Sequence, residues 1–549
     1  MREHVASGFA RRDGKRPSMC SGVLPLLRLK MNIQEETKFA ADLDQSADTG
    51  ALSLKYTTTP SVSADSRYGA GESIAQAIVL TVLYSAPTIW LFSTFNACLD
   101  NDIWWHLATG KWILQNHAIP HTDPFSAYGL GRSWAAYSWA FDLPVAWLVA
   151  HLGFVGLLLL QVVLVTAIIV ALHRLIAALV PDFTLSVLLT FAAAIAMSRV
   201  FTPRPWLLTI LFFILELHLV SRARENGDYR RLLWLPLIFW AWANLHVQFI
   251  YGLFVLMLAV GEAWWSWWKA PCDPVQHRVR NLWTATIIGC IAATLVNPYF
   301  VEIYKVAYQL GTLPGVLNQI SELNAVPFRF LSDYVLLLIA LCAVGAFVWQ
   351  RELRPFPWAL LLWAIFFSFR SQRDIWLLAV VGTAVIATGL KDHAVLTPRH
   401  SRLQSSWVAL GVVVVIAVGC RILGPSVGEQ QRKIAATFPS AAVEFVKEKG
   451  LPGPLFNDYD WGGYLIWSLP EIPVSMDGRA LLHGTRRLER SADTWEAHED
   501  WRSDSELQKA RLIIGPVNAP LCAVLRMDPQ YQLAYEDRVA SVFVRRTDR

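Results

Sequence analysis

The chain has 549 residues, of which 54% are hydrophobic and only 17% are charged, with 25 Trp and 27 Phe. This composition excludes an ordinary soluble globular protein, in which about 25% of residues are charged. The formal net charge of +5 comes largely from loops between apolar segments, so it does not indicate binding to nucleic acid.

Residues 1–72 are mixed in composition, rich in Ser, Thr and Ala, and lack sustained periodicity. Their basic start is not followed by the apolar core and small-residue cleavage site of a signal peptide. We expect a disordered cytoplasmic tail. The alternative is that translation truly starts at Met31, which would remove part of this segment.

Apolar runs close to the length that crosses a bilayer, about 20 residues, recur between residues 74 and 423. They predict an α-helical polytopic membrane protein with a transmembrane domain over residues 73–423. The predicted spans are 74–97, 153–172, 182–198, 205–220, 232–245, 249–268, 281–297, 332–349, 356–369, 375–390 and 405–423.

Lys and Arg concentrate in the N-terminal tail and in alternate short loops, as in the run from Arg222 to Arg231. Because cytoplasmic loops hold the excess of positive charge, eleven spans place the N-terminus in the cytoplasm and residues after Arg421 outside. The first outer loop is then 98–152. Within it, residues 138–151 are apolar but contain Asp142 and Pro144, so we expect an amphipathic helix on the outer surface.

Residues 424–549 have a soluble composition and predict a small extracytoplasmic α/β domain. Its expected elements are an amphipathic helix over 434–449 that ends at Gly450, strands at 454–458 and 511–515, a turn at Gly462 and Gly463, and a last strand near 540–545.

The segment Asp100-Asn-Asp102-Ile-Trp-Trp-His106 directly follows the first span. Asp102 and His106 are four residues apart and would share one face of a helix from Ile103 to about Gln115. Carboxylates at a membrane boundary are costly and are often functional. Asp100 and Asp102 are therefore candidate catalytic acids and candidate ligands of a divalent cation, Mg²⁺ or Mn²⁺. The structural alternative is that Asp100 or Asn101 only caps the helix.

Asp123 lies in the same predicted loop and precedes Pro124. Proline at the next position favours an extended turn, so Asp123 is either a turn-forming residue or a second catalytic acid.

Polar residues also collect at the outer ends of several predicted spans. Arginine there runs against the positive-inside trend, which suggests phosphate binding; the alternatives are snorkelling, a structural ion pair or a hydrated helical hairpin. These candidate substrate-binding residues are Arg199, Arg204, Asn244, His246, Gln248, Arg370 and Arg373.

An acidic pair after the first span, an aromatic-rich surface helix, a many-span bundle and a C-terminal outer domain together resemble the C-type glycosyltransferase superfamily. This superfamily includes oligosaccharyltransferase catalytic subunits and protein O-mannosyltransferases. The stretches 100–110, 120–126, 456–464 and 477–479 look like a group of uncharacterised bacterial membrane proteins near that superfamily. The chain lacks a W-W-D-x-G motif, which argues against transfer to peptide asparagine.

The resemblance implies a glycosyltransferase of the bacterial cytoplasmic membrane, with a polyprenyl-phosphate-linked sugar as donor and the reaction at the extracytoplasmic face. Asp100 or Asp102 would deprotonate an acceptor hydroxyl, His106 would orient the acid or the acceptor, and arginines would bind the phosphate. The acceptor would be an unidentified envelope lipid, glycan or protein. Two other functions are also considered: a transporter or flippase for lipid-linked glycans, and a non-catalytic envelope assembly protein.

Overall fold

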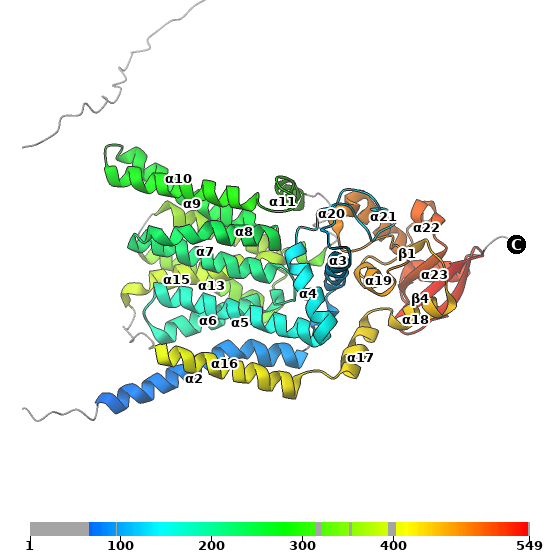
Figure 1. The fold of residues 1–549 in the computed structure, drawn as a ribbon, viewed down its shortest axis with the longest axis horizontal. Coiled ribbons are helices and arrows are strands. Elements are labelled where there is room, and N and C mark those ends of the chain that lie inside the picture. Colours follow the sequence, from blue (N-terminus) through cyan, green and yellow to red (C-terminus); the bar gives the residue numbers. More distant parts are fainter. Residues whose placement is uncertain (1–64, 95, 313–319, 351–353, 394–401, 547–549) are drawn as a thin grey trace, which may run out of the picture.

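A computed structural model of the chain describes residues 65–94, 96–312, 320–350, 354–393 and 402–546. Residues 1–64 of the predicted tail lie outside these described residues. Helices packed side by side form a bundle, and the C-terminal domain covers one end of it (Figure 1). The predicted fold class, a helical membrane protein with a small C-terminal α/β domain, is confirmed.

A bundle helix is found at each of the eleven predicted spans. The last of them packs against the first. The bundle helices are α2 (Asp65–Thr94), α5 (Phe154–Leu179), α6 (Phe183–Met197), α7 (Trp206–Asn226), α8 (Leu235–Leu245), α9 (Phe249–Lys269), α10 (Pro274–Thr294), α13 (Leu331–Gln350), α14 (Pro355–Arg370), α15 (Ile375–Gly389) and α16 (Arg402–Leu423).

Among the described residues, seven helices are long and apolar enough to cross a membrane: α2, α5, α6, α7, α9, α13 and α16. The protein is therefore a multi-pass membrane protein. Helices α8, α14 and α15 are shorter, with 11, 16 and 15 residues. The span predicted over 232–245 corresponds to α8, which begins three residues later, at Leu235, because a 3₁₀ helix, η3 (Tyr229–Trp234), precedes it. Pro236 lies in the first turn of α8, a position where its missing N–H costs nothing.

Two helices of the first loop cross the end of the bundle (Figure 1). They are α3 (Ile103–Asn116), close to its predicted bounds, and α4 (Trp139–Leu152). They pack closely against each other, and α4 also contacts α5 and α8. Asp142 of α4 is fully buried, so this acidic residue does not face solvent as expected for an amphipathic surface helix.

The C-terminal domain contains a four-stranded sheet in the order β1-β2-β4-β3. Strands β1 (Leu455–Asn457) and β2 (Leu512–Pro516) are parallel, and β2, β4 (Ala540–Arg545) and β3 (Tyr531–Glu536) pair antiparallel. The domain also contains helices α20 (Ala480–His483), α21 (Thr485–Trp495), α22 (Ser505–Lys509) and α23 (Pro520–Met527).

Two features of this domain differ from the prediction. The single helix expected over 434–449 is divided into α17 (Val427–Thr437) and α18 (Ser440–Lys449), because Pro439 cannot continue a helix from the preceding turn. The turn expected at Gly462 and Gly463 is instead the start of a helix, α19 (Gly462–Ser468).

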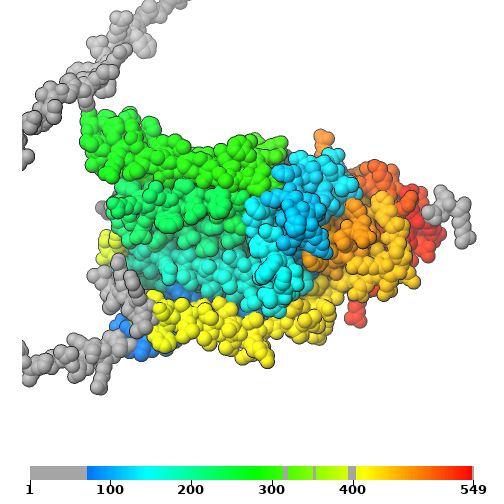
Figure 2. Space-filling model, viewed as in Figure 1, coloured from blue at the N-terminus to red at the C-terminus, as the bar shows by residue number. Residues whose placement is uncertain are grey.

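The C-terminal domain packs directly on the first loop. Helix α19 lies on α3, and a backbone bridge joins Ser126 to Val474. A Cβ atom on Gly463 would lie 2.7 Å from the carbonyl oxygen of Asn101, so glycine permits this close approach. Figure 2 shows the first loop, in blue and cyan, between the bundle and the C-terminal domain, in orange.

Candidate functional site

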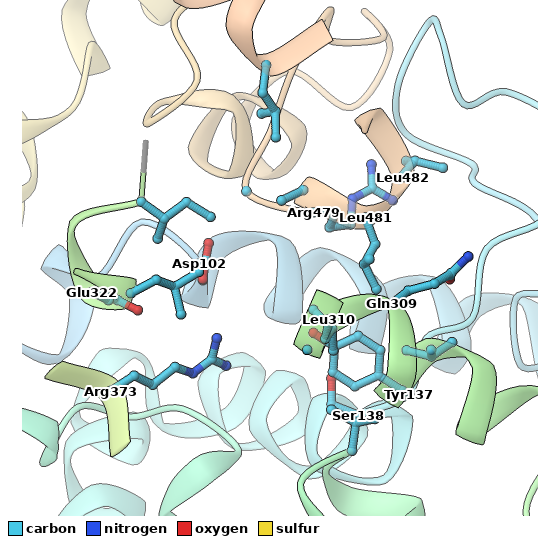
Figure 3. Close-up of a pocket in the computed structure, with 18 of the residues that line it drawn as sticks. Asp102, Tyr137, Ser138, Gln309, Leu310, Glu322, Arg373, Arg479, Leu481 and Leu482 are labelled. Atoms are coloured by element: carbon cyan, nitrogen blue, oxygen red, sulfur yellow. The ribbon is translucent and has the colours of Figure 1, made fainter. Parts of the chain in front are cut away.

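A cavity of about 1250 Å³ lies where the bundle, the first loop and the C-terminal domain meet. Its walls come from the start of α3, the loop before α4, the ends of α7, α9 and α14, helix α11 (Glu302–Thr312), the short helix η4 (Ser321–Leu323) and the C-terminal domain. Figure 3 shows Asp102, Glu322 and Arg373 in one part of this cavity, and Arg479 of the C-terminal domain, which also lines the cavity, in another part.

Arg204 binds three carboxylates at the edge of the cavity. Its Nε donates to both oxygens of Asp100, at 2.8 and 2.7 Å. Its Nη1 lies 2.8 Å from Oδ2 of Asp102, and its Nη2 lies 2.9 Å from Oε1 of Glu322. The Trp206 ring supports the guanidinium, with its centroid 4.7 Å from Cζ. These ion pairs and hydrogen bonds therefore fix the positions of Asp100, Asp102 and Glu322, and they join the start of α7 to the first loop and to η4.

Asp102 is the more accessible acid of the pair, because its side chain is 24% exposed and that of Asp100 only 7%. Asp102 immediately precedes α3 but makes no side-chain capping hydrogen bond; its backbone N–H instead donates to Asp100 Oδ1. Burial raises the pKa of Asp102 to about 6; the Arg204 guanidinium opposes the shift, and the Asp100 and Glu322 carboxylates add to it. Asp102 can therefore exchange a proton near neutral pH.

Arg373, Arg370 and Gln248 also line the cavity. The Nε of Arg373 is buried without a hydrogen-bond partner among the described residues, and its guanidinium lies 4.9 Å from the Trp206 ring centroid. Gln248 donates to Asp374 Oδ1 at 3.3 Å, and its own Oε1 has no partner there. Since buried polar atoms are normally hydrogen-bonded, Arg373 and Gln248 have capacity for a ligand.

The C-terminal domain contributes Asp458, Tyr459 and Asp460 to the cavity wall. Burial, reinforced by the nearby Asp460 carboxylate, raises the pKa of Asp458 to about 7. Gly478 allows the domain to approach the first loop, because a Cβ atom there would lie 2.1 Å from Oδ1 of Asp102.

His106 and Asp123 are buried at positions that do not line this cavity. The Nδ1 of His106 lies 2.6 Å from Oδ1 of Asp142 in α4, so His106 faces α4 and does not share the orientation of Asp102. Asp123 accepts hydrogen bonds from Ser126, and Arg479 pairs with its other oxygen at 2.5 Å. The structure thus connects Asp123 to the C-terminal domain.

Arg199, Asn244 and His246 also lie outside the cavity lining. Arg199 pairs with Asp333 at 3.1 Å and also binds Gln372. Asn244 accepts from the indole of Trp139 and donates to two backbone carbonyls. His246 is buried beside Thr209, with 2.8 Å between its Nδ1 and the hydroxyl. Each of the three side chains joins helices or loops of the bundle.

The candidate metal ligands do not fit a metal site as they stand. Within the described part of the chain, no group of three or more His, Cys, Asp or Glu residues is placed to hold a metal ion. The oxygens of Asp100 point at the Arg204 guanidinium, as does Oδ2 of Asp102. A positively charged group therefore already occupies the place where these carboxylates converge.

Glu322 and the segment 458–460 are cavity residues that the sequence alone did not assign to the site. Glu322 lies between the predicted spans 281–297 and 332–349, as does Glu302, which also lines the cavity, and no local pattern marks either residue as part of the site. The Asp-Tyr-Asp run at 458–460 is conspicuous in the sequence, but its position next to the first loop depends on the packing of α19 against α3.

No protein-family model matches the chain, and no curated protein matches it. Among solved structures, the chain is similar to the oligosaccharyltransferase of Archaeoglobus fulgidus in its apo form, with 11% sequence identity and a TM-score of 0.48. The alignment covers 81% of this chain and 69% of that chain.

Proposed function

We propose that the protein is a membrane glycosyltransferase that moves a sugar from a polyprenyl-phosphate donor to an envelope lipid, glycan or protein. In this proposal it resides in a bacterial cytoplasmic membrane, with its N-terminus in the cytoplasm and residues 424–549 outside. The single observation that carries the proposal is the convergence of Asp102, Arg204 and Arg373, which are far apart in the sequence, on one cavity at the end of the bundle.

Asp102 is the proposed general base. Its carboxylate would take the proton of an acceptor hydroxyl while the hydroxyl oxygen forms a bond to the anomeric carbon of the donor. The bond from that carbon to the phosphate oxygen breaks, and polyprenyl phosphate leaves with the electron pair. A pKa of about 6 suits this role, because the carboxylate is then ionised at neutral pH and still accepts a proton.

Arg373 is the proposed binding residue for the leaving phosphate. Its Nε has no partner among the described residues, and a buried guanidinium forms strong hydrogen bonds to phosphate oxygens. Arg370, exposed at the end of α14, would add a second positive charge. Arg204 is engaged by three carboxylates, so its proposed role is to orient Asp102.

Transfer can be tested with purified full-length protein in liposomes that contain polyprenyl-phosphate donors with a radiolabelled sugar. We expect Asp102→Asn to reduce transfer by about 10²–10⁴-fold, which is the usual contribution of a general base. Asp228→Asn is the matched control, because Asp228 lies just beyond the other end of α7 and pairs with Arg231. Wild-type rates in Asp102→Asn would exclude this carboxylate as the base.

The same assay separates transfer from the two other functions. A flippase would move the labelled donor across the bilayer with the sugar–phosphate bond intact, and an assembly protein would leave it unchanged. Glu216, an acid near the middle of α7, is fully buried and packs near Gly252, but it does not line the cavity. It therefore does not provide the mid-membrane substrate contact that a transporter would require.

A further inference from the structure

The acidic residues around Arg204 are the kind of hard oxygen donor that a divalent cation also binds, but they are spread over the nitrogens of a guanidinium; among the described residues they do not form a group placed to hold a metal ion. Three carboxylates from two parts of the chain, Asp100 and Asp102 in the first loop and Glu322 in η4, approach one positive centre. Mg²⁺ and Mn²⁺ prefer such hard oxygen donors. In this protein each of the three nitrogens of the Arg204 guanidinium group instead lies within hydrogen-bonding distance of at least one of the three carboxylates.

Arg204 is held firmly in this position. Its side chain is only 10% exposed, and the Trp206 ring lies 4.7 Å from Cζ. Its Nη1 also donates to Oε2 of Glu322 at 3.1 Å, so Glu322 is bound through both oxygens. A guanidinium stays protonated at any physiological pH, which makes this a permanent positive charge.

We propose that Arg204 takes the place of a divalent cation in this site, as a cation covalently attached to the protein. The inference rests on the proposed function, because it assigns Arg204 the task of neutralising and orienting the carboxylates for sugar transfer. A metal ion would have to compete with Arg204 for Asp100, Asp102 and Glu322, and its desolvation would be costly. The reaction is therefore independent of added divalent metal.

The proposal predicts that removal of the guanidinium creates a metal site. In Arg204→Ala, three carboxylates lose their shared counter-ion, and closing around a divalent cation is the most direct way to compensate them. We expect the purified full-length variant to bind Mn²⁺ saturably, measured by electron paramagnetic resonance of free Mn²⁺, and the wild type not to. Adding Glu322→Gln to Arg204→Ala should weaken that binding.

Arg199→Ala is the matched control. It also removes a partly buried arginine next to the cavity end of the bundle, but within the described part of the chain Arg199 pairs with a single carboxylate, that of Asp333. No Mn²⁺ site is expected in this variant. A site in Arg199→Ala equal to that in Arg204→Ala would show that binding does not depend on the carboxylates around Arg204 and would overturn the proposal.

Wild-type protein decides the question even if Arg204→Ala does not fold. Saturable Mn²⁺ binding to the wild type that Asp102→Asn abolishes would overturn the proposal, and so would a folded Arg204→Ala variant without a Mn²⁺ site. Sugar transfer by the wild type should proceed at an unchanged rate in excess chelator. The binding measurements need no turnover, so a failure of the proposed function, seen as no transfer from any donor, is distinguishable from a failure of this inference.

Discussion

At the scale of single residues, the clearest prediction concerns how the transfer rate depends on the protonation of Asp102. Burial raises its pKa to about 6, and a general base is active only when ionised. The transfer rate should therefore rise with pH, with about a tenth of the molecules active at pH 5 and about nine-tenths at pH 7. The measurement is the rate at limiting donor between pH 5 and 8. A flat profile would contradict this assignment.

Asp458 provides a control for that profile, because it lines the same cavity and its pKa is raised to about 7. Asp458→Asn should leave the midpoint of the rise near pH 6. A midpoint that moves or disappears in Asp458→Asn would assign the titration to Asp458 instead.

The sequence located some cavity residues but not their partners. Asp102, Arg204, Gln248, Arg370 and Arg373 come together because each lies at the same end of a predicted span. The position of a residue at the end of a predicted span indicates the membrane face at which it lies, but it does not indicate the direction in which its side chain points. His106 faces the buried Asp142 of α4, and that contact depends on tertiary packing between helices that the helical period alone does not reveal.

At the scale of elements, the contact between α3 and α4 depends on Gly110. A Cβ atom at this position would lie 2.1 Å from the backbone carbonyl oxygen of Asp142 and 2.6 Å from Cβ of Ala146. Gly110→Ala should lower the free energy of unfolding by about 1–3 kcal/mol, the usual cost of overpacking. The measurement is thermal unfolding in detergent.

Gly345→Ala is the matched control within α13. A Cβ atom at Gly345 would meet nothing within 4 Å, and alanine is the better helix former by about 0.5–1 kcal/mol. This substitution should leave the protein equally or more stable. Equal stability of the two alanine variants would show that α3 and α4 do not pack as closely as described.

Helices and strands with a clear apolar pattern were predicted well, and those without one were missed. The spans are recognised by their long apolar runs, and the strand at 540–545 buries four of its six side chains, so in both cases the composition shows the element directly. Strand β3 exposes or half-exposes all but its first residue, so it has little of the alternation by which strands are recognised. Helix α19 starts at two glycines, which suggest a turn locally, and its tertiary contacts override that preference.

At the scale of the whole molecule, Arg479 connects the C-terminal domain to the first loop. It pairs with Asp123 and with Asp477, and all three side chains are at most 3% exposed. Arg479→Met would remove the guanidinium from two buried carboxylates, and of these only Asp477 keeps a second pairing, with His483 at 3.2 Å; breaking such a buried pair costs about 3–5 kcal/mol. We expect a lower unfolding temperature and faster limited proteolysis between α16 and the end of the chain.

Arg526→Met is the control for this prediction, because Arg526 pairs with Glu536 at the exposed surface of the same domain and exposed pairs contribute little. If both variants are as resistant to protease as the wild type, the buried network does not hold the domain in place.

The arrangement of the cavity walls has a consequence for biogenesis. The walls come from residues as far apart as Asn101 and Glu496, so a nascent chain that has already inserted its first ten helices still has an incomplete pocket. Only after Arg479 has left the ribosome and the last domain has folded against the first loop can a substrate be enclosed. The proposed transfer reaction would therefore require translation of nearly the whole polypeptide, and partly synthesised molecules would be inactive.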